Sequence, residues 1–142
     1  MLRATRDPST IAVGQVLPAH GHTFTAVDLV SYGAATWDWH RLHYDLSYAR
    51  EKQLPGALID GQAFGAVFAR EAMRWAGTKA FIIRMELKMK SMAFAGDHLV
   101  AQGSVIEVAL GPTQGIVRIT QQMLCDTRLV AHATTQLTLP TQ

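Results

Sequence analysis

The second half of the chain carries a pattern that few folds can accommodate. Apolar and polar side chains alternate through residues 80–90, and three more strand-like segments follow at 98–109, 115–125 and 128–139. Alternation of this kind indicates β-strands with one buried face. The breaks between the segments are short, so consecutive strands are expected to pair antiparallel. In the first segment, the buried face is expected to hold Phe81, Ile83, Met85, Leu87 and Met89.

Only one other segment has the length to cover such a sheet. A helix is predicted from Gly61 to about Trp75, with Asp60 as its N-cap and Gly77 as its C-terminal glycine. At 1.5 Å per residue it spans about 25 Å. One of its faces consists of small residues that let the helix lie close to strands: Gly61, Gly65, Ala66, Ala69 and Ala72. The sequence therefore predicts an α+β fold, an antiparallel sheet wrapped around a central helix.

The first sixty residues are expected to form shorter elements. These are a loose tail at 1–10, a strand at 13–17, a break at 20–22, a helix from Val27 capped by Thr25, and a short helix at 49–53 capped by Ser47. No repeat or linker interrupts the chain. A single domain covering residues 1–142 is therefore expected, which is an ordinary size for one domain.

The composition bears on the partners of the protein. Charged residues make up 17% of the chain, against a usual level of about 25%. Low surface charge and open sheet edges both favour pairing with another subunit, so we expect a homodimer or a higher homo-oligomer. The net charge is only +2 and no Lys/Arg cluster occurs, so a nucleic-acid partner is not expected.

The compartment is indicated by two features. The single Cys125 excludes an internal disulfide and is typical of a reducing environment. The most apolar long segment, 57–76, is interrupted by charged residues, which argues against a membrane span. We expect a cytoplasmic protein that binds no membrane.

The stretch 36–45 concentrates the chemically active residues of the chain. Two histidines, two carboxylates, an arginine and three aromatic residues lie within ten positions. In a helix, Asp38 and His43 would be separated by about 140° of rotation, so they can meet only if the backbone turns out of the helix. Our hypothesis is that the two side chains face each other across a water molecule or a substrate. The alternative is a solvated loop anchored by its aromatic residues.

Other chemistry is less favoured by the same residues. A metal site would use Asp38, His40, His43 and Asp45, but Trp39 and Tyr44 crowd this set and no further ligand completes it, so no metal is expected. Arg41 is expected to pair with Asp45 rather than to contact a phosphate. Cys125 lies within a strand and has no basic neighbour, which disfavours it as a nucleophile.

Three motifs follow one another along the chain: Asp38-Trp39-His40-Arg41-Leu42-His43-Tyr44-Asp45, Ile59-Asp60-Gly61 and Phe94-Ala95-Gly96-Asp97. In these motifs, and from about Thr23 to Leu137 as a whole, the chain resembles the MaoC-like acyl-thioester hydratase/dehydratase family of the hot-dog fold. The His-Arg-Leu-His-Tyr-Asp sequence of the first motif is especially close to the type-2 hydroxyacyl-thioester dehydratase branch. The chain departs from the family at three places. Trp37 stands where members have Gly, and His40-Arg41 stand where they have Asn-Pro. Asp60 stands where many members have His.

The resemblance implies hydration of an enoyl thioester, or the reverse dehydration. Asp38 and His43 would together activate the water, giving a 3-hydroxyacyl thioester of R configuration. Gly61, at the start of the central helix, would offer its N–H to the thioester oxygen, a contribution of roughly 3 kcal/mol. Alternatively, Gly61 serves only close packing.

The substrate would be an acyl group on coenzyme A or an acyl carrier protein, with no separate cofactor. The expected substrate contacts are Trp39, His40, Asp60 and Gln62, with Arg84, Lys88 and Lys90 for phosphates or simply as a solvated strand face. Two other functions remain open. A hot-dog thioesterase would use Asp60, since Glu71 lies too far along the helix, and a non-catalytic subunit would only bind acyl thioesters.

Overall fold

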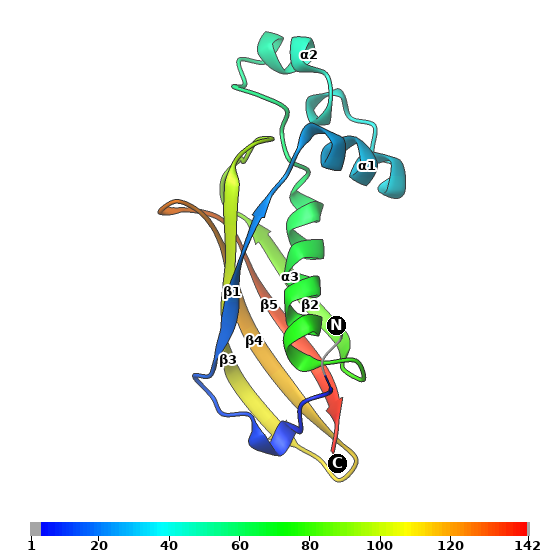
Figure 1. The fold of residues 1–142 in the computed structure, drawn as a ribbon, viewed down its shortest axis with the longest axis vertical. Helices are drawn as coiled ribbons and strands as arrows, with labels where there is room; N and C mark the ends of the chain where they lie inside the picture. Colours follow the sequence, from blue (N-terminus) through cyan, green and yellow to red (C-terminus); the bar gives the residue numbers. More distant parts are fainter. Residues whose placement is uncertain (1–3, 142) are drawn as a thin grey trace.

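In the computed structural model, which describes residues 4–141, a five-stranded antiparallel sheet curves around one long helix (Figure 1). The strand order is β1-β3-β4-β5-β2. The strands are β1 (Val16–Thr23), β2 (Phe81–Met89), β3 (His98–Leu110), β4 (Gln114–Cys125) and β5 (Arg128–Pro140). The helices are η1 (Pro8–Thr10), α1 (Ala26–Thr36), η2 (Arg41–His43), α2 (Leu46–Glu51) and α3 (Gly61–Ala76). This confirms the predicted α+β class and the hot-dog arrangement.

The central helix α3 has the ends that the sequence predicts. Asp60 Oδ1 accepts a hydrogen bond from the Gln62 N–H at 2.9 Å, and the Gly77 N–H donates to the Met73 carbonyl at 2.9 Å. Large side chains, among them Phe68, are buried between α3 and the sheet. The amide of the buried Gln121 on β4 donates to the Phe68 carbonyl at 3.0 Å. The sheet therefore holds α3 by apolar packing and by one buried hydrogen bond.

Strand β1 runs through the segment 20–22, where the sequence analysis expected a break. Gly21 is part of the strand and pairs with Val100 of β3. A Cβ on Gly21 would lie 2.7 Å from the His98 ring. The prediction of a break was wrong, because this glycine serves the close approach of a neighbouring side chain and not a turn.

Strand β2 does not keep the alternation that its sequence suggests. A β-bulge lies between Ile82 and Arg84, where the register against β5 shifts. Ile82 consequently packs against the core, while Phe81 and Ile83 are 67% and 47% exposed. Beyond the bulge, Met85 and Leu87 face the core as predicted. The prediction failed for the first part of the strand because one extra residue reverses the faces. It also failed at the end of the strand, where Met89 is 61% exposed.

Two expectations for the N-terminal part need correction. Helix α2 begins earlier than predicted, and its N-cap is Asp45, which accepts from the Tyr48 N–H at 3.0 Å, instead of Ser47. The expected loose tail is attached to the end of α3 where the structure describes it. Arg6 donates to the carbonyls of Ala76 and Trp75, and Pro8 is buried. Residues 1–3 of that tail lie outside the described residues.

No helix within the described residues 4–141 is both long and apolar enough to cross a bilayer.

Candidate active site

The backbone leaves α1 abruptly, just before Asp38. Trp37 adopts a left-handed conformation, with φ 61° and ψ 26°, and the Asp38 N–H donates to the Gly33 carbonyl at 3.0 Å. A Cβ on Gly33 would lie 2.7 Å from the Asp38 carbonyl oxygen. Gly33 thus makes room for the reversal, which directs Asp38 back along the pocket side of α1.

A single 3-10 turn then brings His43 to the same place. His40 begins this turn, η2, with its ring Nδ1 accepting from the Leu42 N–H at 3.3 Å. His43 Nδ1 lies 2.7 Å from the Leu58 carbonyl oxygen. Because a carbonyl only accepts, this contact requires the proton on Nδ1 and leaves Nε2 with a free lone pair.

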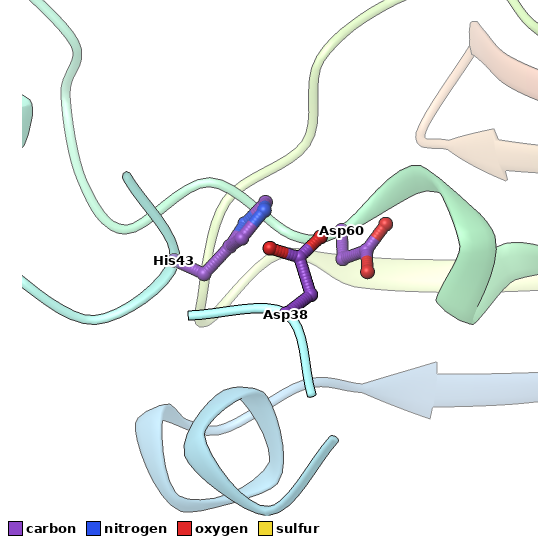
Figure 2. A group of neighbouring side chains, drawn as sticks. All are labelled: Asp38, His43 and Asp60. Atoms are coloured by element: carbon purple, nitrogen blue, oxygen red, sulfur yellow. The ribbon is translucent and has the colours of Figure 1, made fainter. Parts of the chain in front are cut away.

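Asp38, His43 and Asp60 converge on one small pocket. One ligand atom from each of the three lies within 4.8 Å of the other two. Figure 2 shows the Asp38 carboxylate between the His43 ring and Asp60, although the three residues come from different parts of the chain. The pocket has room for about one water molecule, and its other lining residues are Leu29, Tyr32, Gly33 and Ala63. The sequence hypothesis that Asp38 and His43 meet agrees with this geometry.

The three polar side chains are held by their own backbone contacts. Asp38 Oδ1 accepts from the His40 N–H at 3.1 Å, and Asp60 Oδ1 caps α3. Asp60 Oδ2 is buried and has no hydrogen-bond partner among residues 4–141. Burial first, and the negative charge of Asp60 second, raise the pKa of the Tyr32 phenol in the pocket wall. The pocket therefore stabilises neutral over anionic groups at this wall.

Gly61 lies beside the pocket at the start of α3, and it has a packing role as well. A Cβ on this residue would lie 1.8 Å from the Met89 sulfur, so Met89 rests directly against the helix start. Both interpretations of Gly61, close packing and an available N–H, are compatible with this position.

Other predicted contacts lie outside the pocket lining. Trp39 and His40 are on the exposed side of the loop, where the Trp39 ring contacts Trp37 and Tyr44 edge to face. The His40 ring centroid is 6.0 Å from that of His43. Gln62 is exposed and contributes only its capped backbone N–H to the geometry described. Of the predicted substrate contacts, the structure brings only Asp60 into the lining.

The basic residues of β2 are also on the surface. Arg84 forms an ion pair with Glu86 at 2.7 Å, and both side chains are more than half exposed. Lys88 and Lys90 are exposed on either side of Met89, the residue that covers Gly61. The two lysines thus lie near the pocket end of the sheet, whereas Arg84 is occupied by its ion pair.

The four residues considered for a metal site do not form one cluster. Asp45 caps α2 and receives two hydrogen bonds from Arg41, at 3.0 and 2.8 Å. The ion pair predicted for Arg41 and Asp45 is confirmed. Asp45 is thereby committed elsewhere, and the described cluster that fits a metal contains Asp60 in its place.

Glu71 on α3 is distant from the pocket. It lies ten positions beyond Gly61, about 15 Å along the helix axis. It is buried, and its carboxylate is near Arg70 at 3.1 Å and His20 at 3.2 Å. Glu71 is therefore not at this pocket, whereas Asp60, the carboxylate considered for a thioesterase, lines it.

The residues of α1 in the pocket wall were missed by the sequence analysis. Leu29, Tyr32 and Gly33 line the pocket together with Asp38. Their spacing of three and four positions places them on one helix face, and this was the available signal. From the sequence, this helix was expected only to deliver the chain to the loop.

Comparisons with known proteins bear on this geometry. The family model for hydroxyacyl-thioester dehydratase type 2 matches residues 4–94, well over half of the 142 residues. The match includes the loop with Asp38 and His43 and the whole of α3. The chain belongs to this family. A search of curated proteins found no match to the sequence.

Solved structures share the fold of this dehydratase family member. The (R)-hydratase from A. caviae involved in PHA biosynthesis has a TM-score of 0.83 at 21% identity, covering 92% of this chain and 98% of the other. A monoamine oxidase regulatory protein from Archaeoglobus has a TM-score of 0.85 at 16% identity, covering 100% and 99%. A chain of the ChsH1-ChsH2 complex from Mycobacterium tuberculosis has a TM-score of 0.76 at 23% identity, covering 90% and 98%. At these identities the likeness shows the common fold.

Proposed function

We propose that the protein is an acyl-thioester hydratase, or in the reverse direction an (R)-3-hydroxyacyl-thioester dehydratase. The observation that carries the proposal is the meeting of Asp38 and His43 in one pocket beside the start of α3. Two proton-exchanging groups at one point are what addition of water to an enoyl thioester requires. Membership of the dehydratase family supports the same reaction class.

In the proposed hydration, Asp38 and His43 hold one water molecule between them. His43 Nε2, with its lone pair free, accepts a proton as the water oxygen bonds to the β-carbon. Asp38 accepts a hydrogen bond from the second O–H of the water, which stays intact in the new hydroxyl group, and so fixes the direction of the water. The π electrons of the 2,3 double bond move toward the thioester carbonyl, and the α-carbon then receives the proton from the imidazolium. Dehydration follows the same steps in reverse.

The negative charge that develops on the thioester oxygen needs a donor. The first N–H groups of α3 have no partners within the helix and carry the positive end of its dipole. We assign the Gly61 N–H to this role, because Gly61 directly follows the pocket residue Asp60. A preorganised donor of this kind lowers the activation free energy by roughly 3 kcal/mol.

The carrier of the acyl group and the assembly complete the proposal. Coenzyme A or an acyl carrier protein would place phosphates near Lys88 and Lys90, at the pocket end of β2. Structural neighbours include two-component complexes, ChsH1-ChsH2 and HadBC from Mycobacterium tuberculosis. We infer that this chain also assembles, as a homodimer. The exposed Phe81 and Ile83 on the edge strand β2 favour burial against a second copy.

The test is a turnover panel with crotonyl-CoA and longer enoyl-CoA thioesters, following the enoyl absorbance. We expect loss of absorbance, with kcat/KM reduced about 10²- to 10⁴-fold in Asp38→Asn and in His43→Ala. His20→Ala, at a histidine outside the pocket, is the control and should remain within a few-fold of the wild type. Release of free thiol without hydration would instead indicate a thioesterase. Binding without any turnover would indicate a non-catalytic subunit.

A further inference from the structure

Asp38, His43 and Asp60 each retain one polar atom that the backbone does not engage. One atom of each is already engaged by the backbone: Asp38 Oδ1 by the His40 N–H, His43 Nδ1 by the Leu58 carbonyl, and Asp60 Oδ1 by the Gln62 N–H. The other carboxylate oxygens and His43 Nε2 remain as acceptors. The three side chains are neighbours (Figure 2), and one ligand atom of each lies within 4.8 Å of the other two. An acceptor set of this kind lacks a donor or a cation at its centre.

The charge of the pocket points the same way. Its lining contains two carboxylates and one imidazole, and none of the lining residues, all of them within 29–63, is Lys or Arg. The Asp60 side chain is buried, and its Oδ2 receives no hydrogen bond within the described part of the chain. A buried carboxylate without a partner costs free energy, which a bound cation would recover. Hydration by the Asp38–His43 pair leaves this third group without a role.

We propose that the pocket binds one divalent transition-metal ion, with Zn²⁺ as the favoured ion, through Asp38, His43 and Asp60. One imidazole nitrogen and two carboxylate oxygens form a donor set that Zn²⁺ accepts, with a fourth position for water. The bond from His43 Nδ1 to the Leu58 carbonyl is the outer contact that fixes the tautomer of a ligating histidine and directs Nε2 to the metal.

The spacing of the three side chains is close to what such an ion requires. Ligand atoms at 2.0–2.2 Å from a tetrahedral Zn²⁺ lie about 3.4 Å apart. The corresponding separations in the protein are at most 4.8 Å. Side-chain movements of about 1 Å therefore complete the site. The metal site differs from the catalytic pair Asp38–His43 by the Asp60 carboxylate, which binds the ion but takes no part in the proposed hydration.

The ion would regulate the proposed reaction. A metal bound to His43 Nε2 and Asp38 occupies the lone pairs that the proposed hydration uses to hold and deprotonate water. Zn²⁺ is thus an inhibitor that competes with the productive water, and a chelator restores activity. This consequence rests on the proposed function, whereas the binding of the ion does not.

The binding test uses the full chain freed of metal with a chelator, titrated with Zn²⁺ by calorimetry and with Co²⁺ by visible absorption. We expect one ion per chain. Asp60→Asn should weaken binding at least tenfold, because it removes the charge but keeps an acceptor for the helix cap. Asp38→Asn should have the same effect. His20→Ala is the control, at a histidine outside the pocket lining, and should bind as the wild type does.

Several results would overturn the proposal. These are the absence of saturable binding by the wild type, unchanged affinity in Asp60→Asn, or affinity that is lost in His20→Ala but kept in Asp60→Asn. Circular dichroism melting of each variant shows whether it is folded. If Asp60→Asn does not fold, the affinity of Asp38→Asn for Zn²⁺ tests the proposal in its place.

A separate assay distinguishes this inference from the proposed function. Enoyl-CoA hydration is measured with and without Zn²⁺, and inhibition reversed by chelator supports the regulatory consequence. If the wild type hydrates substrate but binds no ion, only the metal inference fails. If it binds the ion with the expected variant pattern but shows no turnover, only the proposed function fails.

Discussion

The two ends of α3 each carry a buried carboxylate, and they differ in what surrounds it. Asp60 caps the start of the helix and shares its pocket with Asp38 and His43. Glu71, near the other end, has Arg70 within 3.1 Å and Arg74 within 3.9 Å. In each residue one oxygen receives no hydrogen bond of good geometry within residues 4–141. The difference is therefore the counter-charge, which Glu71 has and Asp60 lacks.

This contrast separates a structural group from a chemical one. Around Glu71 the cationic side chains neutralise the carboxylate, and its neighbour Trp75 is packed beneath Arg6 of the N-terminal segment. Near Asp60 the helix start faces a pocket whose acceptors remain available. A carboxylate thus stabilises the fold at Glu71, whereas at Asp60 it offers an unsatisfied group to the pocket.

The largest effect is expected from neutralising each carboxylate in turn. In metal-free protein, Asp60→Asn should raise the free energy of unfolding by about 1 kcal/mol, because it removes a buried charge that has no partner. Glu71→Gln should lower it by about 1–2 kcal/mol, since it leaves arginines unpaired, with the loss reduced by their partial exposure. Urea unfolding at neutral pH measures both. Changes of the same sign would contradict the contrast between the two ends.

A smaller effect is expected from adding one methyl group at two glycines of α3. In Gly61→Ala the new Cβ meets the Met89 sulfur, which belongs to an exposed side chain able to swing away. Stability should therefore change by less than about 1 kcal/mol, while kcat of the proposed hydration falls about tenfold because the helix start is crowded.

Gly65→Ala is the matched control for that substitution. Its Cβ would lie 3.4 Å from Leu87, an ordinary contact, one turn deeper in the same helix. Alanine should stabilise the helix by about 0.5–1 kcal/mol and leave turnover unchanged. Equal turnover in both variants would show that Gly61 serves only packing.

The same two ends show how far the sequence predicts the molecule. Strand alternation, the length of α3 and its caps at Asp60 and Gly77 followed from local periodicity and capping chemistry. Convergence of Asp38 and His43 was predicted only as a hypothesis, because it depends on the left-handed turn at Trp37. The pairing of Glu71 with His20 joins residues fifty-one positions apart and has no local signal. The bulge after Ile82 was not predicted for a related reason, because the neighbouring strand β5 decides the register of β2.

The smallest expected effect is on the free energy of unfolding at low pH, through the N-terminal cap of α1. The Thr25 hydroxyl, and then the Thr25 backbone, donate to Asp28 in the cap of α1 and lower the pKa of its carboxyl. Because the pKa is lower in the folded state, this cap contributes stability above the unfolded value of about 3.9 and loses it as the pH falls through the folded value. The change affects the helix that carries Leu29 and Tyr32 in the pocket wall.

Asp28→Asn should therefore flatten the acid limb of the stability curve, with a difference from the wild type that is present at pH 6 and is lost as the pH falls through the folded-state pKa of Asp28. Urea unfolding across that range measures it, and Thr25→Ala should cost about 1 kcal/mol at neutral pH as a reference for the whole cap. Hydrogen exchange at pH 4 locates the change. Faster exchange in α1 than near Glu71 would extend the contrast between the two ends to their acid stability, whereas uniform exchange would limit it to the carboxylates themselves.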